Sequence, residues 1–356
     1  MLMNSPIVKL KHSIKTLIFS CAFCTNIVSA HSNHDNRHSN FDYKSSNHWV
    51  HLADGSMLIG TSHGEIDVAA DGTFYVSIME DGNKQGGIKK FSRAGNFLGQ
   101  VPNAPADFHG FVIHADNTDQ EYIYGARLNG MRLIKMSLDG KIVMNIDAVK
   151  AVPKQYHASG LDRRNRLKPP MKLTAIAVDA KDNMYVVDGY SLDYIHKFDA
   201  SGNYLKTFGG KDAPYKFRNC HKIHIDPRFA PNRLICTDRV NGRLVHMDLN
   251  GELIGDYATN LRRPSAVDFF GDIAAVAEIS GRVSLINKAG KTVKTLGTND
   301  TKAEINTNRT KPEQWQRGRL TAPHGITFDH NGDLFITEWN KWGRIVRFDL
   351  SRQGHK

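Results

Sequence analysis

The stretch Thr174-Ala175-Ile176-Ala177-Val178-Asp179, followed by Met184-Tyr185-Val186-Val187, has a form that recurs six times in the chain. Most copies consist of a short apolar strand that ends near an acidic residue, a turn, and a second apolar strand. The copies begin at residues 64, 109, 174, 221, 265 and 324, which are 45, 65, 47, 44 and 59 positions apart. A period near 45 residues with longer insertions is typical of the four-stranded blades of a β-propeller.

Two further strand patterns follow most copies. In the third copy, Ile195-His196-Lys197-Phe198 and Tyr204-Leu205 flank a Ser-Gly-Asn turn, which predicts a β-hairpin. The sixth copy stops after its third strand, and we expect Trp49-Val50-His51-Leu52 to supply the fourth, because closure removes open sheet edges. The sequence therefore predicts an all-β fold, a single six-bladed β-propeller over residues 48–352, with long loops at 147–173 and 298–320.

The first 47 residues do not follow the repeat. Residues 1–30 hold three lysines, no acid, an apolar middle and a Val28-Ser29-Ala30 ending, the pattern of a signal peptide cleaved after Ala30. A lipoprotein signal at Cys21 fits less well, because Phe19 is bulky for such a site. We therefore expect a secreted or periplasmic protein. Residues 31–47 are rich in His, Asn and Ser, which predicts a flexible polar tail; metal binding by its histidines is the alternative.

Cleavage would leave two cysteines, Cys220 and Cys236. In an oxidising compartment they could form a disulfide. The expected register of the two neighbouring strands, however, sets Cys236 opposite Ile223. Both states stay open, and we favour two free thiols.

Charge and hydropathy exclude two classes of partner. The formal net charge is +11, of which residues 1–30 contribute +3. Lysines and arginines are scattered, and the one dense run, Arg163 to Lys168, is typical of a solvated loop, so we expect no nucleic-acid partner. No apolar run approaches about 18 residues, so we expect no membrane span. We expect a monomer that acts on a small molecule or a peptide.

Three of the six copies begin with histidine, namely His109, His221 and His324. They belong to the second, fourth and sixth copies, and alternate blades of a six-bladed ring lie about 120° apart. The first strand of each blade lines the axis, so the three imidazoles should point at one another. Three histidines and a water form a known catalytic zinc site. The third and fifth copies begin with Thr174 and Ser265, so the repeat itself does not require histidine.

The loops between second and third strands should reach the same mouth of the propeller. They offer candidate catalytic side chains, Tyr190 and Arg239, and candidate substrate-binding side chains, Arg127 and Glu338. The alternative for Tyr190 and Arg239 is packing within a surface loop. Asp188 and Asp238 are expected to hold loop backbone rather than to act in catalysis.

The repeats resemble NHL repeats, and residues 60–350 resemble the peptidyl-α-hydroxyglycine α-amidating lyases. Three elements carry this likeness: the His-Gly pairs at 109 and 324, Val-Asp-Gly-Tyr at 187–190, and Asp-Arg-x-Asn-Gly-Arg at 238–243. The resemblance implies a zinc ion held by the three histidines and the cleavage of peptidyl-α-hydroxyglycine to a peptide amide and glyoxylate. It also implies that Tyr190 is the catalytic base and that Arg239 is a cationic partner of the substrate.

The chain departs from this family's pattern at three positions. His63 stands where the family has a further arginine, so His63 joins the candidate catalytic residues. Ala322 replaces a methionine. Gly325 replaces an aspartate that binds a structural calcium, so calcium is possible but less well supported than zinc.

Two other functions remain open. One is a zinc-dependent propeller hydrolase or lactonase that acts on another small substrate. The other is a non-enzymatic NHL scaffold that binds proteins or glycans on its open face. Metal content would separate the scaffold from the enzymes, and glyoxylate release would separate the two enzymes.

Overall fold

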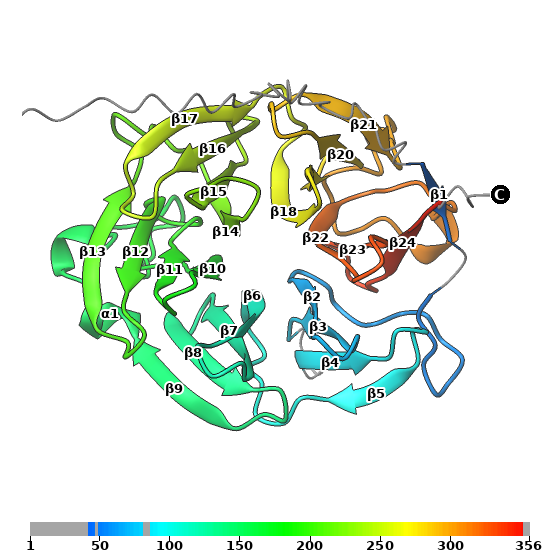
Figure 1. The fold of residues 1–356 in the computed structure, drawn as a ribbon, viewed down its shortest axis with the longest axis horizontal. Coiled ribbons are helices and arrows are strands. Elements are labelled where there is room, and N and C mark those ends of the chain that lie inside the picture. Colours follow the sequence, from blue (N-terminus) through cyan, green and yellow to red (C-terminus); the bar gives the residue numbers. More distant parts are fainter. Residues whose placement is uncertain (1–41, 47–48, 81–85, 352–356) are drawn as a thin grey trace, which may run out of the picture. The chain divides into compact units, whose positions relative to one another are not determined.

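The computed structural model describes residues 42–46, 49–80 and 86–351. These residues form six four-stranded antiparallel sheets arranged around a central axis (Figure 1). The predicted all-β fold, a six-bladed β-propeller, is confirmed. The expected signal peptide and nearly all of the expected tail lie outside the described residues.

The first three blades follow the chain in order. Blade one holds β2 (Ile66–Val68), β3 (Phe74–Ile78), β4 (Gly87–Phe91) and β5 (Phe97–Gln100). Blade two holds β6 (Phe108–Ala115), β7 (Glu121–Arg127), β8 (Arg132–Ser137) and β9 (Ile142–Asp147). Blade three holds β10 (Ala175–Val178), β11 (Met184–Val187), β12 (Tyr194–Phe198) and β13 (Tyr204–Gly209).

The other three blades complete the ring. Blade four holds β14 (Cys220–Asp226), β15 (Arg233–Asp238), β16 (Arg243–Met247) and β17 (Leu253–Ala258). Blade five holds β18 (Pro264–Phe270), β19 (Ile273–Glu278), β20 (Arg282–Ile286) and β21 (Thr292–Leu296). Blade six holds β22 (Pro323–Phe328), β23 (Leu334–Glu338), β24 (Ile345–Leu350) and the N-terminal β1 (Tyr43–Ser45).

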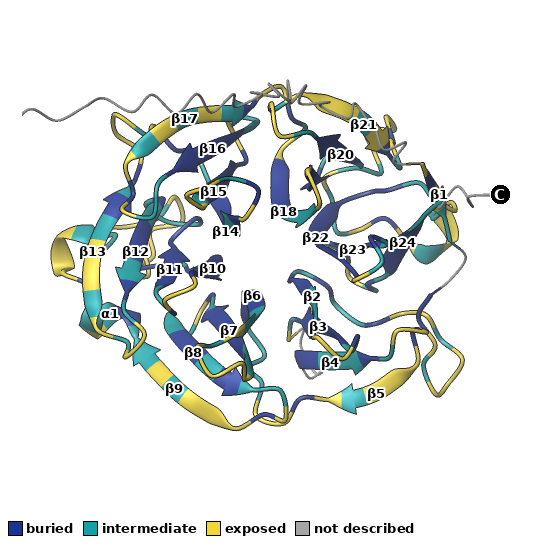
Figure 2. Cartoon of the chain, viewed as in Figure 1, coloured by how far each residue is buried: buried dark blue, intermediate teal, exposed yellow. Residues whose placement is uncertain are grey.

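Burial falls from the axis outward (Figure 2). The inner strand β10 of blade three is buried along its whole length, because blade two packs against one of its faces and blade four against the other. This explains its continuous apolar run, which is typical of strands covered on both sides. By contrast, the outermost strand of blade five, β21, is mostly exposed, and buried and exposed residues do not alternate strictly along it.

The two long loops were predicted correctly. After Asp147, the last residue of β9, the first loop contains the one-turn helix α1 (Ala148–Ala151), the 3₁₀ turn η1 (Lys154–Tyr156) and an isolated bridge between Leu161 and Leu167. Residues 298–320 contain only the 3₁₀ turn η2 (Pro312–Gln314). Among the described residues, no helix combines the length and the apolar character needed to cross a membrane.

The strand that closes the ring is not the predicted one. Tyr43–Ser45 pairs with β24, with Tyr43 opposite Leu350 and Ser45 opposite Phe348. Trp49 instead packs its indole between Phe74 of blade one and Phe335 of blade six, with ring centroids 4.8 Å from each. A tryptophan buries more apolar area in that gap than on an outer strand. The propeller therefore begins inside the segment predicted to be a flexible tail.

The two cysteines form a disulfide, so the preference for free thiols was wrong. The predicted register is correct, because Ile223 does lie opposite Cys236. A β-bulge between Cys220 and Ile223 nevertheless shifts the strand and brings the two cysteine Cα atoms to 5.7 Å, within bonding range.

The closing strand gives a first prediction. The Tyr43 ring is buried and its hydroxyl donates to the Gly332 carbonyl oxygen at 2.8 Å. Tyr43→Ala should lower the free energy of unfolding by about 3 kcal/mol, because it empties part of the closing interface. Lys44→Ala, on the exposed side of the same strand, is the matched control and should change it by less than about 0.5 kcal/mol. Urea unfolding of both variants measures this; equal, small effects would contradict closure by β1.

Candidate metal centre

Three histidines stand at equivalent positions of alternate inner strands. His109, His221 and His324 lie at the starts of β6, β14 and β22, and all three are buried. In each of these strands the pairing register shifts at the histidine. Such β-bulges change the direction in which a side chain points. In these three strands the imidazole at the bulge points toward the axis. We call this region, where the three strands begin, the hub.

The structure brings the three imidazoles together. The ring centroids are separated by 4.9 Å for His109 and His221, 4.8 Å for His221 and His324, and 5.0 Å for His109 and His324. The rings are steeply inclined to one another, at 75° to 87°. The three side chains therefore form a nearly equilateral, propeller-like triangle around the axis.

A backbone carbonyl of the next blade orients each ring. His109 Nδ1 lies 2.8 Å from the Thr174 oxygen, His221 Nδ1 lies 2.7 Å from the Ser265 oxygen, and His324 Nδ1 lies 3.2 Å from the Gly64 oxygen. Each acceptor occupies the histidine position of its own blade. A carbonyl can only accept, so Nδ1 carries the proton and Nε2 presents its lone pair to the hub.

Burial keeps these imidazoles neutral. It lowers the pKa of His109, His221 and His324 well below the ordinary value, and the nearby Arg239 guanidinium acts in the same direction. The Nε2 atom of His324 is buried and has no hydrogen-bond partner among the described residues. Buried polar atoms are rarely left without a partner, so an unpaired neutral nitrogen is suited to a metal ion.

The spacing of the rings fits zinc. Zinc–nitrogen bonds of about 2.1 Å in a tetrahedral site put imidazole centroids on the order of 5 Å apart, close to the three separations in the hub. A fourth imidazole, His63, offers a competing set, because its donor atom and those of His109 and His324 lie within 4.8 Å of one another. His63 is only half-buried, and its ring forms no hydrogen bond with a backbone carbonyl in the described parts of the chain. The set of His109, His221 and His324 differs from this one in that a backbone carbonyl orients each of its rings.

Tyr190 and Arg239 extend from the loops after β11 and β15 to the same hub. The Tyr190 hydroxyl lies 3.0 Å from His221 Nε2, 3.3 Å from His109 Nε2 and 3.4 Å from His63 Nε2. Arg239 Nη1 donates to that hydroxyl at 3.2 Å. The Tyr190 hydroxyl oxygen thus lies within hydrogen-bonding distance of Arg239, of His63 and of two of the candidate metal ligands.

Arg239 is a buried cation without an anionic partner. It is 5% exposed, its Nη2 donates to the Ser265 hydroxyl at 3.1 Å, and its Nε has no partner. Within the described part of the chain, no carboxylate forms an ion pair with it. Burial lowers its pKa from the ordinary value. An unpaired buried charge is costly, and a bound anion at this position would lower that cost.

Arg127 and Glu338, predicted to bind substrate, make contacts that hold loops. Arg127 Nε donates to Asp107 at 2.7 Å. Glu338 is fully buried, accepts the backbone N–H groups of Thr321 and Ala322, and pairs with Arg344. These contacts fix the segments that lead into β6 and β22, which is a structural task.

Asp188 and Asp238 do hold backbone, as predicted. Asp188 accepts the N–H groups of Lys172 and Leu192, and Asp238 accepts that of Arg218. The aspartates at the ends of the second strands thus share one role, which is to accept hydrogen bonds from the backbone of a nearby loop. The sequence reveals this role only when the blades are compared.

Sequence reasoning missed a buried ion pair that lies one residue further along the inner strands. Lys222 Nζ donates to Glu65 Oε2 at 2.5 Å, and both side chains are about 5% exposed. The pair joins blades four and one across the axis. The sequence feature that could have predicted this pair is a Lys and a Glu at the position where the other copies have Gly or Ala.

This ion pair bears on the calcium that the family resemblance implied. A Cβ atom added at Gly325 would lie 2.7 Å from Glu65 Oε1, so an aspartate has no room there. The Glu65 carboxylate already binds the Lys222 ammonium group. Calcium needs six to eight oxygen ligands, and the residues around Gly325 do not fit it.

No protein-family model matches the chain. Among solved structures, a streptogramin B lyase is 17% identical, covering 88% of this chain and 99% of its own, with a TM-score of 0.53. Virginiamycin B lyase from Staphylococcus aureus is 11% identical, covering 87% and 99%, also with a TM-score of 0.53. A Bacteroides thetaiotaomicron protein of unknown function is 15% identical, covering 81% and 69%, with a TM-score of 0.51. At these identities, what is shared is the fold.

The ion pair under the hub gives a second prediction. Glu65→Met should lower the free energy of unfolding by about 3–5 kcal/mol, because it leaves the Lys222 ammonium buried without a counter-charge. The double variant Glu65→Met/Lys222→Met should recover most of this loss. Urea unfolding of the three proteins measures the difference; additive losses in the double variant would contradict a direct pairing.

Proposed function

We propose that this chain is an exported zinc-dependent lyase that cleaves peptidyl-α-hydroxyglycine to a peptide amide and glyoxylate. One observation supports it most: the Tyr190 hydroxyl is held between imidazole Nε2 atoms and a buried guanidinium that has no anion of its own. A proton acceptor, a metal-ligand set and a carboxylate-binding cation are the three components that this reaction needs.

His109, His221 and His324 would hold the zinc ion through Nε2. When bound, zinc would supply a Lewis acid that polarises the α-hydroxyl group of the substrate. The three backbone carbonyls that accept from Nδ1 keep the rings aimed and increase their basicity as ligands. The buried, neutral state of the imidazoles means that no proton must leave before the ion binds.

Arg239 binds the substrate carboxylate in this scheme. Its planar guanidinium suits a two-point contact with a carboxylate. Binding also relieves the cost of the unpaired buried charge. The carboxylate carbon is bonded to the α-carbon, so its capture places the hydroxyl and the scissile C–N bond beside Tyr190.

Tyr190 moves the proton. As the phenolate, its oxygen takes the hydroxyl proton while the C–N bond breaks and the carbonyl of glyoxylate forms. The same proton then passes to the departing amide nitrogen, so the phenolate is restored and the reaction is balanced without water. Arg239 Nη1 donates to the same oxygen, and His63 Nε2, 3.4 Å away, positions it.

The structural neighbours support the broader class only. Two of them are named as lyases that share the propeller fold. The hydrolase and scaffold alternatives remain distinguishable, because neither would release glyoxylate.

A third prediction concerns metal content. The purified chain should hold about one zinc per molecule after dialysis, and His221→Ala should hold less than about a tenth of that. His63→Ala should keep its zinc, because that imidazole is outside the oriented set. Elemental analysis measures all three. Loss of zinc in His63→Ala with retention in His221→Ala would show that the other set binds the ion.

A fourth prediction concerns catalysis. With α-hydroxyhippurate as substrate, Tyr190→Phe should lower kcat at least about 100-fold, because it removes the proton acceptor, while zinc content stays unchanged. Glyoxylate release measures the rate, and elemental analysis checks the metal. Absence of glyoxylate from the zinc-loaded wild-type protein would reject the lyase. Wild-type activity in Tyr190→Phe would remove Tyr190 from the reaction.

A further inference from the structure

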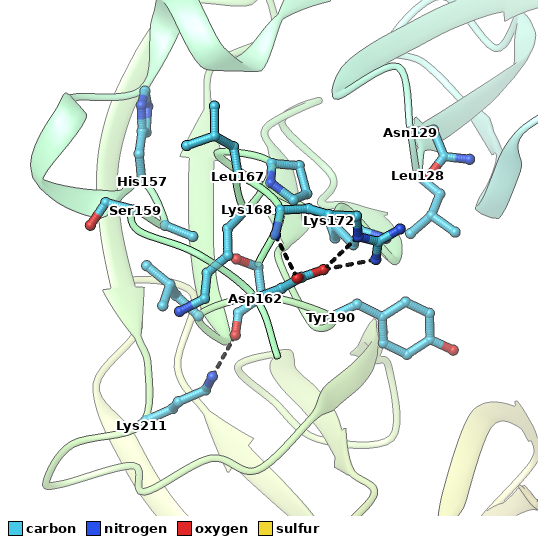
Figure 3. A pocket seen from close by; sticks show the side chains of 15 residues that line it. Leu128, Asn129, His157, Ser159, Asp162, Leu167, Lys168, Lys172, Tyr190 and Lys211 are labelled. Carbon is cyan, nitrogen blue, oxygen red and sulfur yellow. Dashed lines mark hydrogen bonds and ion pairs between the residues drawn. The ribbon is translucent and has the colours of Figure 1, made fainter. Parts of the chain in front are cut away.

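Two pockets meet at Tyr190. The first has a volume of about 800 Å³ and is lined largely by the loop at 157–172 together with Tyr190, Ser191 and Lys211. The second has a volume of about 950 Å³ and is lined by residues of the 211–219 loop and by Arg239 and Arg263. Tyr190, Ser191 and Lys211 line both pockets, so the two spaces flank the Tyr190 loop. Figure 3 shows the first pocket, with Lys168, Lys172 and Lys211 on its walls.

The walls carry an excess of positive charge. Five lining cations form no ion pair with any acid in the described parts of the chain: Lys168, Lys172, Lys216, Arg218 and Arg263. Two of the three lining acids are already used. Asp162 pairs with Arg166 at 2.7 Å, and Asp193 is buried, accepts the Cys220 N–H at 2.9 Å and lies 4.0 Å from Lys211. Only Asp212 remains as a counter-charge.

We propose that these two pockets form one basic groove, which binds the peptide part of the substrate and selects acidic residues N-terminal to the α-hydroxyglycine. This inference rests on the proposed function. With the substrate carboxylate at Arg239 and the scissile bond at Tyr190, the peptide must leave the hub through the space that borders Tyr190. Both described pockets that border it are walled by unpaired cations.

The groove also explains the insertion at 147–173. Its dense basic run, predicted to be a solvated loop, contributes Arg166 and Lys168 to the first pocket. Arg166 neutralises the acid beside it and leaves Lys168 free to face a ligand. Charges gathered in a concave site raise the local concentration of an oppositely charged substrate, so the preference should appear in kcat/KM.

Matched substrates test this directly. Two peptides would end in Phe-α-hydroxyglycine, one preceded by Glu-Asp and the other by Gln-Asn, and α-hydroxyhippurate would serve as a substrate without a peptide. We expect kcat/KM for the acidic peptide to exceed that for the neutral peptide about tenfold at low ionic strength. The ratio should fall toward one near 0.5 M salt, where the Debye length is about 4 Å.

Removing lysine charges from the groove tests whether the groove causes the preference for acidic peptides. Lys168→Gln/Lys172→Gln should reduce the acidic-to-neutral ratio about fivefold, the loss expected for two partly exposed ion pairs. Lys141→Gln, an exposed lysine in the turn between β8 and β9, removes one charge elsewhere and should leave the ratio unchanged. Equal ratios in all variants would overturn the assignment of the groove.

Binding of the product gives a readout that does not depend on turnover. Fluorescence anisotropy of labelled Glu-Asp-Phe-amide and Gln-Asn-Phe-amide, with the same protein, should show tighter binding of the acidic amide and the loss of this difference in Lys168→Gln/Lys172→Gln. Glyoxylate release with equal ratios and equal binding would overturn the groove and leave the proposed function intact. Tight acidic binding without glyoxylate from any substrate would support the groove and reject the lyase.

Discussion

Three hydrogen bonds between an imidazole and a backbone carbonyl, each made from one blade to the next, determine the geometry of the hub. Each bond joins a histidine to the residue at the same position of the next blade, which is Thr174, Ser265 or Gly64. The bond from His324 to Gly64 joins the last blade to the first. The hub is therefore complete only when the propeller is closed, which makes the short strand at Tyr43–Ser45 part of the requirement for the site.

Electrostatics prepares this hub for a ligand. Two cations, Arg239 and Lys222, lie buried near three neutral imidazoles. Lys222 has a counter-charge in Glu65, whereas Arg239 has none among the residues that the structure describes. The buried pair of Lys222 and Glu65 fixes the arrangement of the strands on the axis beneath the rings. Arg239 is left to bind an anion that comes from outside the chain. The basic walls on both sides of Tyr190 continue the same sign of charge away from the hub.

The repeat pattern predicted the six blades and the meeting of His109, His221 and His324, because both depend on periodicity. Tyr190 and Arg239 followed from the loops that share one mouth. The rest depends on local packing that a period does not record. Trp49 fills a gap between blades instead of forming a strand, and a β-bulge brings Cys220 to Cys236. Glu338 and Arg127 hold loops because partners in the preceding loops face them.

Diffraction from zinc-soaked crystals, collected on both sides of the zinc absorption edge, tests the central claim most directly. The geometry of the hub predicts one strong anomalous peak on the propeller axis, about 2.1 Å from the Nε2 atoms of His109, His221 and His324. A peak bound by His63 in place of His221, or no peak at the hub, would contradict it.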